Sequence, residues 1–217
     1  MKKHIVCYGD SNTHGFCADP ADSADGGIRF NEDERYPCVL QKMLGDDYIV
    51  LEEGMNGRTS SFDDPLIEGA NGLSAIVQTL KCHEPVDLLI IMLGTNDTKS
   101  CFGQCSKGIA YGLRRILKKA IDTECWDGKK PSVLYVCPPV IPEEIRSRES
   151  AEMMGPDCWK RSKELSKYME TFCKELDVDF LDADGIEVNR FDYLHLTKKG
   201  HQQLAGRLYR YITGLNL

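Results

Sequence analysis

The chain has 217 residues, of which 41% are hydrophobic and 28% are charged, and its formal net charge is −7. These values are typical of a globular protein with one hydrophobic core, and the scattered basic residues argue against nucleic acid or an anionic membrane as the main partner. The longest apolar run, residues 88–93, is too short to span a bilayer. The first residues lead directly into an apolar strand without a secretory signal, so we expect a cytoplasmic protein with a single domain, residues 1–217.

Short apolar runs alternate with amphipathic helical patterns along the chain. The runs predict five buried strands at residues 4–9, 48–53, 87–93, 132–137 and 178–182. Apolar residues at helical spacing predict helices at residues 36–44, 69–83, 106–122, 157–176 and 197–213. This alternation indicates an α/β fold, a three-layer α/β/α sandwich around a five-stranded parallel sheet. Right-handed crossovers favour the flavodoxin-like strand order 2-1-3-4-5.

Ten cysteines are many for a chain of this length. None occurs in a Cys-x-x-Cys pair, and without a secretory signal we expect reduced thiols rather than a disulfide framework. Cys101 and Cys105 are spaced like metal ligands, but no other ligand residues accompany them. The sequence therefore predicts neither a metal site nor a cofactor.

Two motifs at opposite ends of the chain carry the parts of an acyl-transfer triad. Gly9-Asp10-Ser11-Asn12 follows the first predicted strand, and Asp192-x-x-His195 follows the fifth. Carboxyl ends of parallel strands lie at the sheet edge where open α/β folds bind ligands. A serine hydroxyl becomes nucleophilic when a base takes its proton, and a nearby carboxylate fixes the tautomer of that base. We therefore expect Ser11, His195 and Asp192 to form a serine hydrolase triad.

Other histidines and one cysteine are weaker candidates for this chemistry. His14 lies close to Ser11 in sequence, but no carboxylate is placed to orient its ring. His201 falls inside a predicted helix, where packing or a surface position is the simpler explanation. Nothing near Cys17 in the sequence suggests a thiol with a lowered pKa. Ser11 and His195 remain the preferred pair.

Hydrogen-bond donors for a developing oxyanion also follow predicted strands. Gly57 lies in the segment after the second strand, and Asn96 lies in Gly94-Thr95-Asn96-Asp97 after the third. Acyl transfer needs donors directed at the oxygen that becomes negative in the tetrahedral intermediate. The backbone N–H groups of Ser11 and Gly57 and the side-chain amide of Asn96 supply three such donors, although each segment alone is also typical of a turn.

Together the motifs resemble the four sequence blocks of the SGNH, or GDSL-type, hydrolases. The resemblance extends in order from residue 5 to about residue 205, and residues 52–59 with Asp63-Asp64-Pro65 are similar to the arylesterase and acyltransferase branch. It implies Ser11 as nucleophile, His195 as base and Asp192 as the residue that orients it. It also implies an oxyanion hole formed by Ser11, Gly57 and Asn96.

One residue departs from the family pattern. Asn12 stands where a leucine often follows the serine, and we expect its side chain, with Asp10 and Phe16, to border the substrate pocket. The branch also commonly forms homo-oligomers, and the long connections 12–35 and 138–156 and nearby loops carry apolar residues that either form such contacts or pack on their own loops. These residues are Phe30, Phe62, Ile141, Met153, Met154 and Trp159.

The resemblance and the residues together predict a metal-free esterase that acts on small-molecule, short-chain esters through an acyl-serine intermediate. The same branch also transfers acyl groups to alcohols or peroxide. One alternative is a carbohydrate or thioester deacylase with the same triad. A second is a flavodoxin-like module that binds a nucleotide or phosphate, but residues 10–15 carry a carboxylate and lack the Gly-x-Gly-x-x-Gly pattern.

Overall fold

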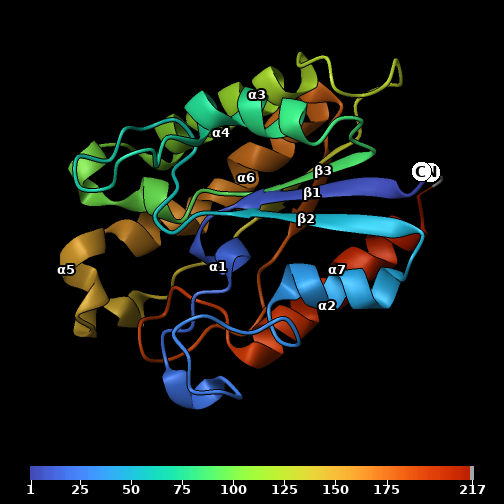
Figure 1. Cartoon of the computed structure of the whole chain (residues 1–217). Coiled ribbons are helices and arrows are strands. Elements are labelled where there is room, and N and C mark those ends of the chain that lie inside the picture. Colours follow the sequence, from blue (N-terminus) through green and yellow to red (C-terminus); the bar gives the residue numbers. More distant parts are fainter. Residues whose placement is uncertain (216–217) are drawn as a thin grey trace.

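A five-stranded parallel sheet forms the centre of the protein (Figure 1). The structure, a computed structural model, describes residues 1–215. The strands lie in the order β2-β1-β3-β4-β5, and every neighbouring pair is parallel. The predicted fold class and strand order are therefore confirmed.

The helices and strands follow the predicted segments closely. The strands are β1 (Lys3–Gly9), β2 (Tyr48–Gly54), β3 (Leu88–Met92), β4 (Val133–Cys137) and β5 (Asp179–Asp182). The α-helices are α1 (Ser11–His14), α2 (Tyr36–Leu44), α3 (Gly72–Cys82), α4 (Ser106–Ile121), α5 (Ser150–Met154), α6 (Cys158–Leu176) and α7 (Lys198–Thr213). Short 3-10 turns occupy Pro20–Asp22, Asn96–Thr98, Ser100–Phe102 and Glu143–Ser147.

The start of α3 differs most from its prediction. The helix begins at Gly72 rather than residue 69, because the side chain of Asn71 accepts a hydrogen bond from the N–H of Leu73 at 3.1 Å and caps the first turn. The short helices α1 and α5 are absent from the prediction, since one turn of helix leaves little periodic signal.

Helices cover both faces of the sheet and create two hydrophobic cores. Helices α3, α4 and α6 pack on one face and α2 and α7 on the other (Figure 1). Alternate residues of β3 serve the two sides: Leu89 and Ile91 face the first core, and Leu88 and Ile90 face the second. Because both faces of β3 are buried, all of its residues are apolar.

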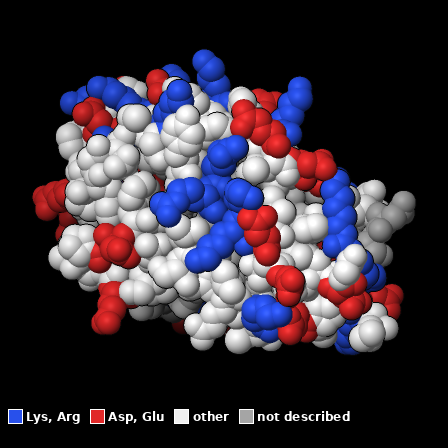
Figure 2. All heavy atoms as spheres, turned by 90° about the horizontal axis from the view of Figure 1, so that it is seen from above, with Lys and Arg blue, Asp and Glu red and all other residues white. Residues whose placement is uncertain are grey.

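Charged groups of both signs share the face covered by α3 and α4. Figure 2 shows basic side chains gathered near the centre of this face with carboxylates beside them. Ion pairs such as Lys118–Asp122 and Arg114–Glu175 belong to α4 and its surroundings. Neither sign of charge covers the face alone. Within residues 1–215, no helix is both long and apolar enough to cross a membrane.

The cysteines form no disulfide in the described part of the chain, and all ten are free thiols. Cys7 and Cys137 lie on buried strands, where burial raises the pKa of each thiol well above its ordinary value. Both side chains therefore act as small hydrophobic groups in the core.

Three of the apolar residues in the long loops are buried. Phe30, Ile141 and Met154 are buried, with 1 to 2% of each residue exposed. Ile141 and Met154 pack together with Leu194, which attaches the loop after β4 to the loop before α7. Of the other apolar loop residues that the sequence offered for oligomer contacts or local packing, Phe62 and Trp159 are half-buried and Met153 is exposed.

A glycine at the end of β2 lets the first helix approach the sheet edge. A Cβ atom on Gly54 would lie 2.1 Å from the backbone nitrogen of His14, a distance that real Cβ atoms do not adopt. Helix α1 therefore packs directly on the end of β2, and its first residue, Ser11, lies at the carboxyl edge of the sheet.

Candidate active site

The structure brings Ser11, His195 and Asp192 into one hydrogen-bonded array. His195 Nε2 lies 2.8 Å from Ser11 Oγ, and His195 Nδ1 lies 2.5 Å from Asp192 Oδ2. Ser11 begins α1 directly after β1, whereas the other two residues lie in the loop between β5 and α7. An ionised carboxylate only accepts hydrogen bonds, so Nδ1 donates to Asp192 and Nε2 is left to accept the serine proton.

Asp192 is held as a carboxylate by several donors. Its Oδ1 accepts the N–H groups of Leu194 and His195 at 2.9 and 3.1 Å. Burial raises the pKa of Asp192, but the His195 ring and these N–H groups outweigh burial and hold the pKa below its ordinary value. Tyr193 has a φ of 60°, the left-handed conformation that turns the loop tightly between the two side chains.

Asn189 braces the same loop and was not predicted from the sequence. Its backbone N–H and its Nδ2 donate to the carbonyl of His195 at 2.8 and 2.9 Å. Its Oδ1 accepts the N–H groups of Phe191 and Asp192. An asparagine shortly before an Asp-x-x-His motif is the available signal, because asparagine side chains often cap the turns that follow them.

Three hydrogen-bond donors indicate an anion site beside Ser11. Among the described residues, the backbone N–H groups of Ser11 and Gly57 have no hydrogen-bond partner. Gly57 has a φ of 79°, where glycine is favoured, and a Cβ there would lie 2.4 Å from Ile67 Cδ1. Asn96 donates one Nδ2 hydrogen to the carbonyl of Arg58 at 3.1 Å, which leaves its second hydrogen for a ligand.

A cavity of about 200 Å³ opens over these groups. Its walls are mainly apolar and combine residues from five loops. They are Ser11, Phe16, Asn56, Gly57, Ile67, Thr95, Asn96, Lys99, Met153, Met154, Leu194 and His195. Phe16 is among these residues, and its ring lies against the His195 ring, with their centroids 4.6 Å apart.

The structure corrects the predicted pocket positions of Asn12 and Asp10. Asn12 is 2% exposed, and its side chain hydrogen-bonds the backbone of Leu194 and Leu196 instead of facing the cavity. Asp10 is buried at the start of α1, where its Oδ1 accepts the N–H of Asn12 at 3.0 Å and caps the helix, and burial raises the pKa of Asp10 to about 6. Both side chains cap or brace backbone, which the motif alone does not reveal.

In the described part of the chain, the other histidines and Cys17 form no side-chain hydrogen bond with Ser11, Asp192 or His195. His201 is fully buried, accepts the N–H of Tyr36 at Nδ1, and burial lowers its pKa to about 3. His83 contacts Glu53 at 2.6 Å. Burial raises the pKa of Cys17. Among the described histidines, His195 is therefore the one within hydrogen-bond distance of Ser11.

Two buried carboxylates join the loops that carry Gly57 and Asn96. Asp97 is fully buried and accepts the N–H of Ser60 at 2.9 Å as well as its hydroxyl, and burial raises the pKa of Asp97 to about 6. Asp64 forms a buried ion pair with Lys99, with 2.7 Å between Oδ2 and Nζ. Burial raises the pKa of Asp64, but Lys99 and backbone donors bring it below its ordinary value. These contacts fix one side of the cavity.

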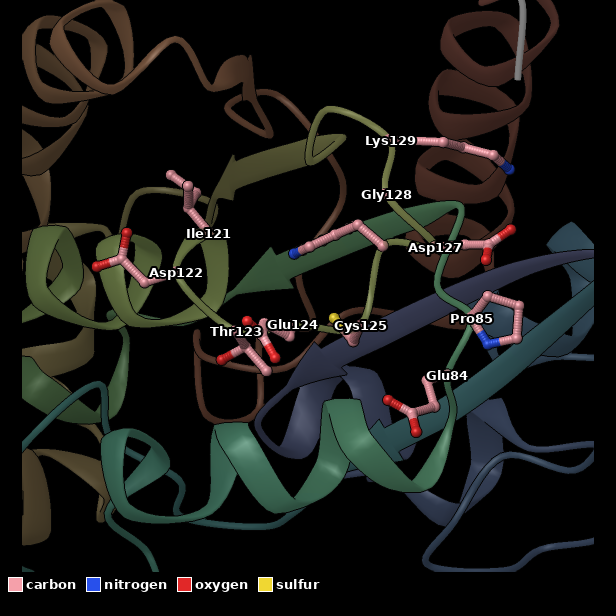
Figure 3. A pocket seen from close by; sticks show the side chains of 11 residues that line it. Glu84, Pro85, Ile121, Asp122, Thr123, Glu124, Cys125, Asp127, Gly128 and Lys129 are labelled. Atoms are coloured by element: carbon pink, nitrogen blue, oxygen red, sulfur yellow. The ribbon is translucent and has the colours of Figure 1, made fainter.

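A larger hollow of about 630 Å³ lies at the opposite, amino edge of the sheet (Figure 3). Figure 3 shows carboxylates of Glu84, Asp122, Glu124 and Asp127 around it, arising from the segments before β3 and after α4. It contains no serine or histidine. The smaller cavity is therefore the candidate active site. Among residues 1–215, no group of three or more histidine, cysteine or acidic side chains has the arrangement of a metal site.

The chain is similar to several known esterases. The chain is 32% identical to a structure of the M. smegmatis aryl esterase, with a TM-score of 0.86, over 98% of this chain and 99% of the other. It is 30% identical to a carbohydrate acetylesterase from Sinorhizobium meliloti, with a TM-score of 0.86, over 98% and 99% of the two chains. It is also 30% identical over 116 residues to an acetylxylan esterase from Xylanibacter ruminicola. That match covers 52% of this chain but 21% of the relative.

The matches that cover nearly the whole of both chains identify the protein as a carboxylic ester hydrolase. The model of the GDSL-like lipase/acylhydrolase family matches residues 7–203, and the chain belongs to that family. The family assignment therefore favours the predicted hydrolase over the nucleotide-binding alternative.

Proposed function

We propose that the protein hydrolyses short-chain carboxylic esters through an acyl-serine intermediate. The observation that carries this proposal is the array in which His195 contacts both Ser11 and Asp192. His195 takes the hydroxyl proton as Ser11 Oγ attacks the ester carbonyl, and then gives a proton to the leaving alcohol. The same imidazole next activates water, which releases the acid and regenerates Ser11.

Asp192 and the three donors support the charged states of this reaction. The carboxylate of Asp192 stabilises the imidazolium that forms during attack, and its lowered pKa favours the ionised form that this role needs. The N–H groups of Ser11 and Gly57 and the amide of Asn96 hydrogen-bond the oxyanion. Because these donors are already held by the surrounding loops, little reorganisation is needed at the moment of reaction.

The size of the cavity supports a preference for small acyl groups. Its volume is about 200 Å³, and a cavity of about 150 Å³ in another protein is large enough to hold benzene. An acetyl or butyryl group therefore fits inside this volume, whereas a long fatty acyl chain exceeds it and would have to extend out of the cavity. The apolar walls favour acyl groups without charge.

Acetylated carbohydrates are the second candidate substrate class. This candidate is supported by the similarity of the chain to an acetylxylan esterase and to a carbohydrate acetylesterase. An acetyl group fits the cavity in either case, so the alcohol portion distinguishes the candidates. Transfer of the acyl group to an alcohol in place of water uses the same acyl-serine intermediate.

A series of p-nitrophenyl esters from acetate to octanoate tests the proposal, with Ser11→Ala as the inactive control. The expected kcat/KM is highest for acetate to butyrate and falls for longer chains. Acetylated xylo-oligosaccharides measured beside the series separate aryl from carbohydrate esters, and added methanol detects acyl transfer as methyl ester. Highest kcat/KM for octanoate would contradict the proposed acyl preference.

We also propose that a second copy of the chain covers the mouth of the cavity. Four large apolar side chains are exposed on the connections between strands and helices, Ile28, Leu66 and Phe191 on loops and Met153 on α5, with 54 to 88% of each residue exposed. Met153 itself lines the cavity, and Phe191 adjoins Asp192 in the chain. Light scattering at micromolar concentration is expected to give a multiple of 24.4 kDa, and a monomeric mass would reject this proposal.

A further inference from the structure

A buried amide next to the nucleophile holds the backbone on both sides of the proposed base. Asn12 Oδ1 accepts the N–H of Leu196 at 2.8 Å, and Asn12 Nδ2 donates to the carbonyl of Leu194 at 3.2 Å. Leu194 and Leu196 are the two neighbours of His195 in the chain. One side chain therefore links helix α1 to the segment that carries the imidazole.

The contacts inside the loop do not replace this link. Asn189 and the Asp192 carboxylate bond to groups of their own loop, so they fix its shape rather than its position relative to α1. Asn12 belongs to α1, one residue after Ser11, and is itself anchored by the bond from its N–H to Asp10. Its two side-chain bonds are the polar contacts that tie the described part of this loop to α1, apart from the Ser11–His195 contact itself.

The leucine that often follows the nucleophile in related motifs cannot make either bond. Asn12 is 2% exposed, so a leucine there would leave the N–H of Leu196 and the carbonyl of Leu194 without their partner and shielded from water. In a reaction that depends on a 2.8 Å contact, a displacement of about 1 Å is enough to reduce the rate about 10²-fold.

We propose that Asn12 is a positioning residue that sets the distance between Ser11 and His195 through the backbone of residues 194 and 196. It touches neither substrate nor reacting atoms, and it acts through the placement of His195. The inference rests on the proposed function, because it assigns His195 as the base that receives the Ser11 proton.

The first test compares Asn12→Leu with Gln41→Leu, a control that removes a similar side-chain amide elsewhere in the fold. Gln41 also uses its side chain to bond backbone, donating to Gly45 and Tyr48 and accepting from Val50, but it lies near the amino end of β2. We expect Asn12→Leu to lower kcat for p-nitrophenyl acetate by roughly 10- to 100-fold with KM changed less than about twofold. Gln41→Leu is expected to lower the melting temperature and leave kcat within about twofold of the wild type.

The second test uses Asn12→Asp, in which a fall in pH restores the hydrogen bond to the carbonyl of Leu194. This variant also tests the inference if Asn12→Leu does not fold. In Asn12→Asp, the ionised carboxylate accepts from Leu196 but repels the carbonyl of Leu194. The protonated acid has the shape of the amide and donates to that carbonyl. We expect the ratio of the kcat of Asn12→Asp to that of the wild type to rise as the pH falls and the introduced carboxyl gains its proton.

The outcomes separate this inference from the proposed function. An active Ser11→Ala protein would reject the nucleophile and leave the role of Asn12 without its basis. If Ser11→Ala is inactive but Asn12→Leu keeps a kcat within twofold of the wild type, the inference is wrong and the proposed function stands. A kcat ratio for Asn12→Asp that does not change with pH would also overturn it.

Discussion

The side-chain amide of Asn96 offers a quantitative test of the proposed oxyanion hole. One of its two Nδ2 hydrogens is bound by the carbonyl of Arg58 at 3.1 Å, so the amide has a fixed orientation and one donor remains for the substrate. Asn96 is 8% exposed and lines the cavity beside Ser11. Asn96→Ala removes this donor while the Ser11–His195–Asp192 array is left in place.

The expected loss in kcat is about 10² to 10³-fold, or about 2.7–4 kcal/mol of transition-state stabilisation, the range for one oxyanion donor. A stability effect accompanies it, because the buried carbonyl of Arg58 loses its donor at a cost of about 1–3 kcal/mol. Thermal melts and titration of the active serine separate the two effects, since kcat per active site reports the folded protein alone.

Asn56→Ala is the matched control for this prediction. Asn56 also lines the cavity, but it is exposed at the mouth and forms no side-chain hydrogen bond in the described part of the chain. Its replacement is expected to change kcat by less than about twofold, because no hydrogen bond in the described part of the chain fixes its exposed side chain as a donor to the oxyanion. Equal losses in the two variants, or an Asn96→Ala kcat within about threefold of the wild type, would refute the assignment of Asn96.

Three further predictions address the surroundings of the array. Gly57→Ala, at a φ of 79°, is expected to lower kcat roughly 10- to 10³-fold by displacing one donor N–H, as steady-state kinetics will show. Burial raises the pKa of Asp97 from 3.8 to about 6. Between pH 3.8 and about pH 6 the folded protein therefore holds more protons than the unfolded chain. As the pH rises through this range, the free energy of unfolding is expected to fall by up to about 3 kcal/mol. Urea unfolding should show this loss in the wild type relative to Asp97→Asn, and parallel pH profiles of the two proteins would contradict it. Dialysis against EDTA is expected to leave the rate unchanged, because proton transfer within a serine triad needs no Lewis acid; a loss that zinc restores would contradict this.

The fold was predictable from local patterns. Residues 88–92 are apolar throughout and lie in a strand covered on both faces, whereas α4 shows apolar residues at helical spacing because one of its faces is buried. The triad motifs were also recognisable, since Ser11, Asn96 and His195 all follow strands and parallel strands end at a common edge.

The bracing contacts of the site were not predictable from the sequence. Asn12 bonds to backbone 182 and 184 positions away, and a backbone partner leaves no residue-type signal at those positions. The ion pair between Lys99 and Asp64 likewise depends on two loops that meet only in the folded chain. Apolar residues such as Phe30 gave no indication of whether their loops would bury them.

Labelling with a fluorophosphonate tests the central claim most directly. Such a reagent reacts with a serine whose hydroxyl is activated by a neighbouring base, and the distance of 2.8 Å between Ser11 Oγ and His195 Nε2 supplies that activation. Mass spectrometry is expected to find one adduct, on Ser11, with loss of esterase activity in proportion to labelling and with no labelling of Ser11→Ala. An adduct on another residue, or an active Ser11→Ala protein, would contradict the account.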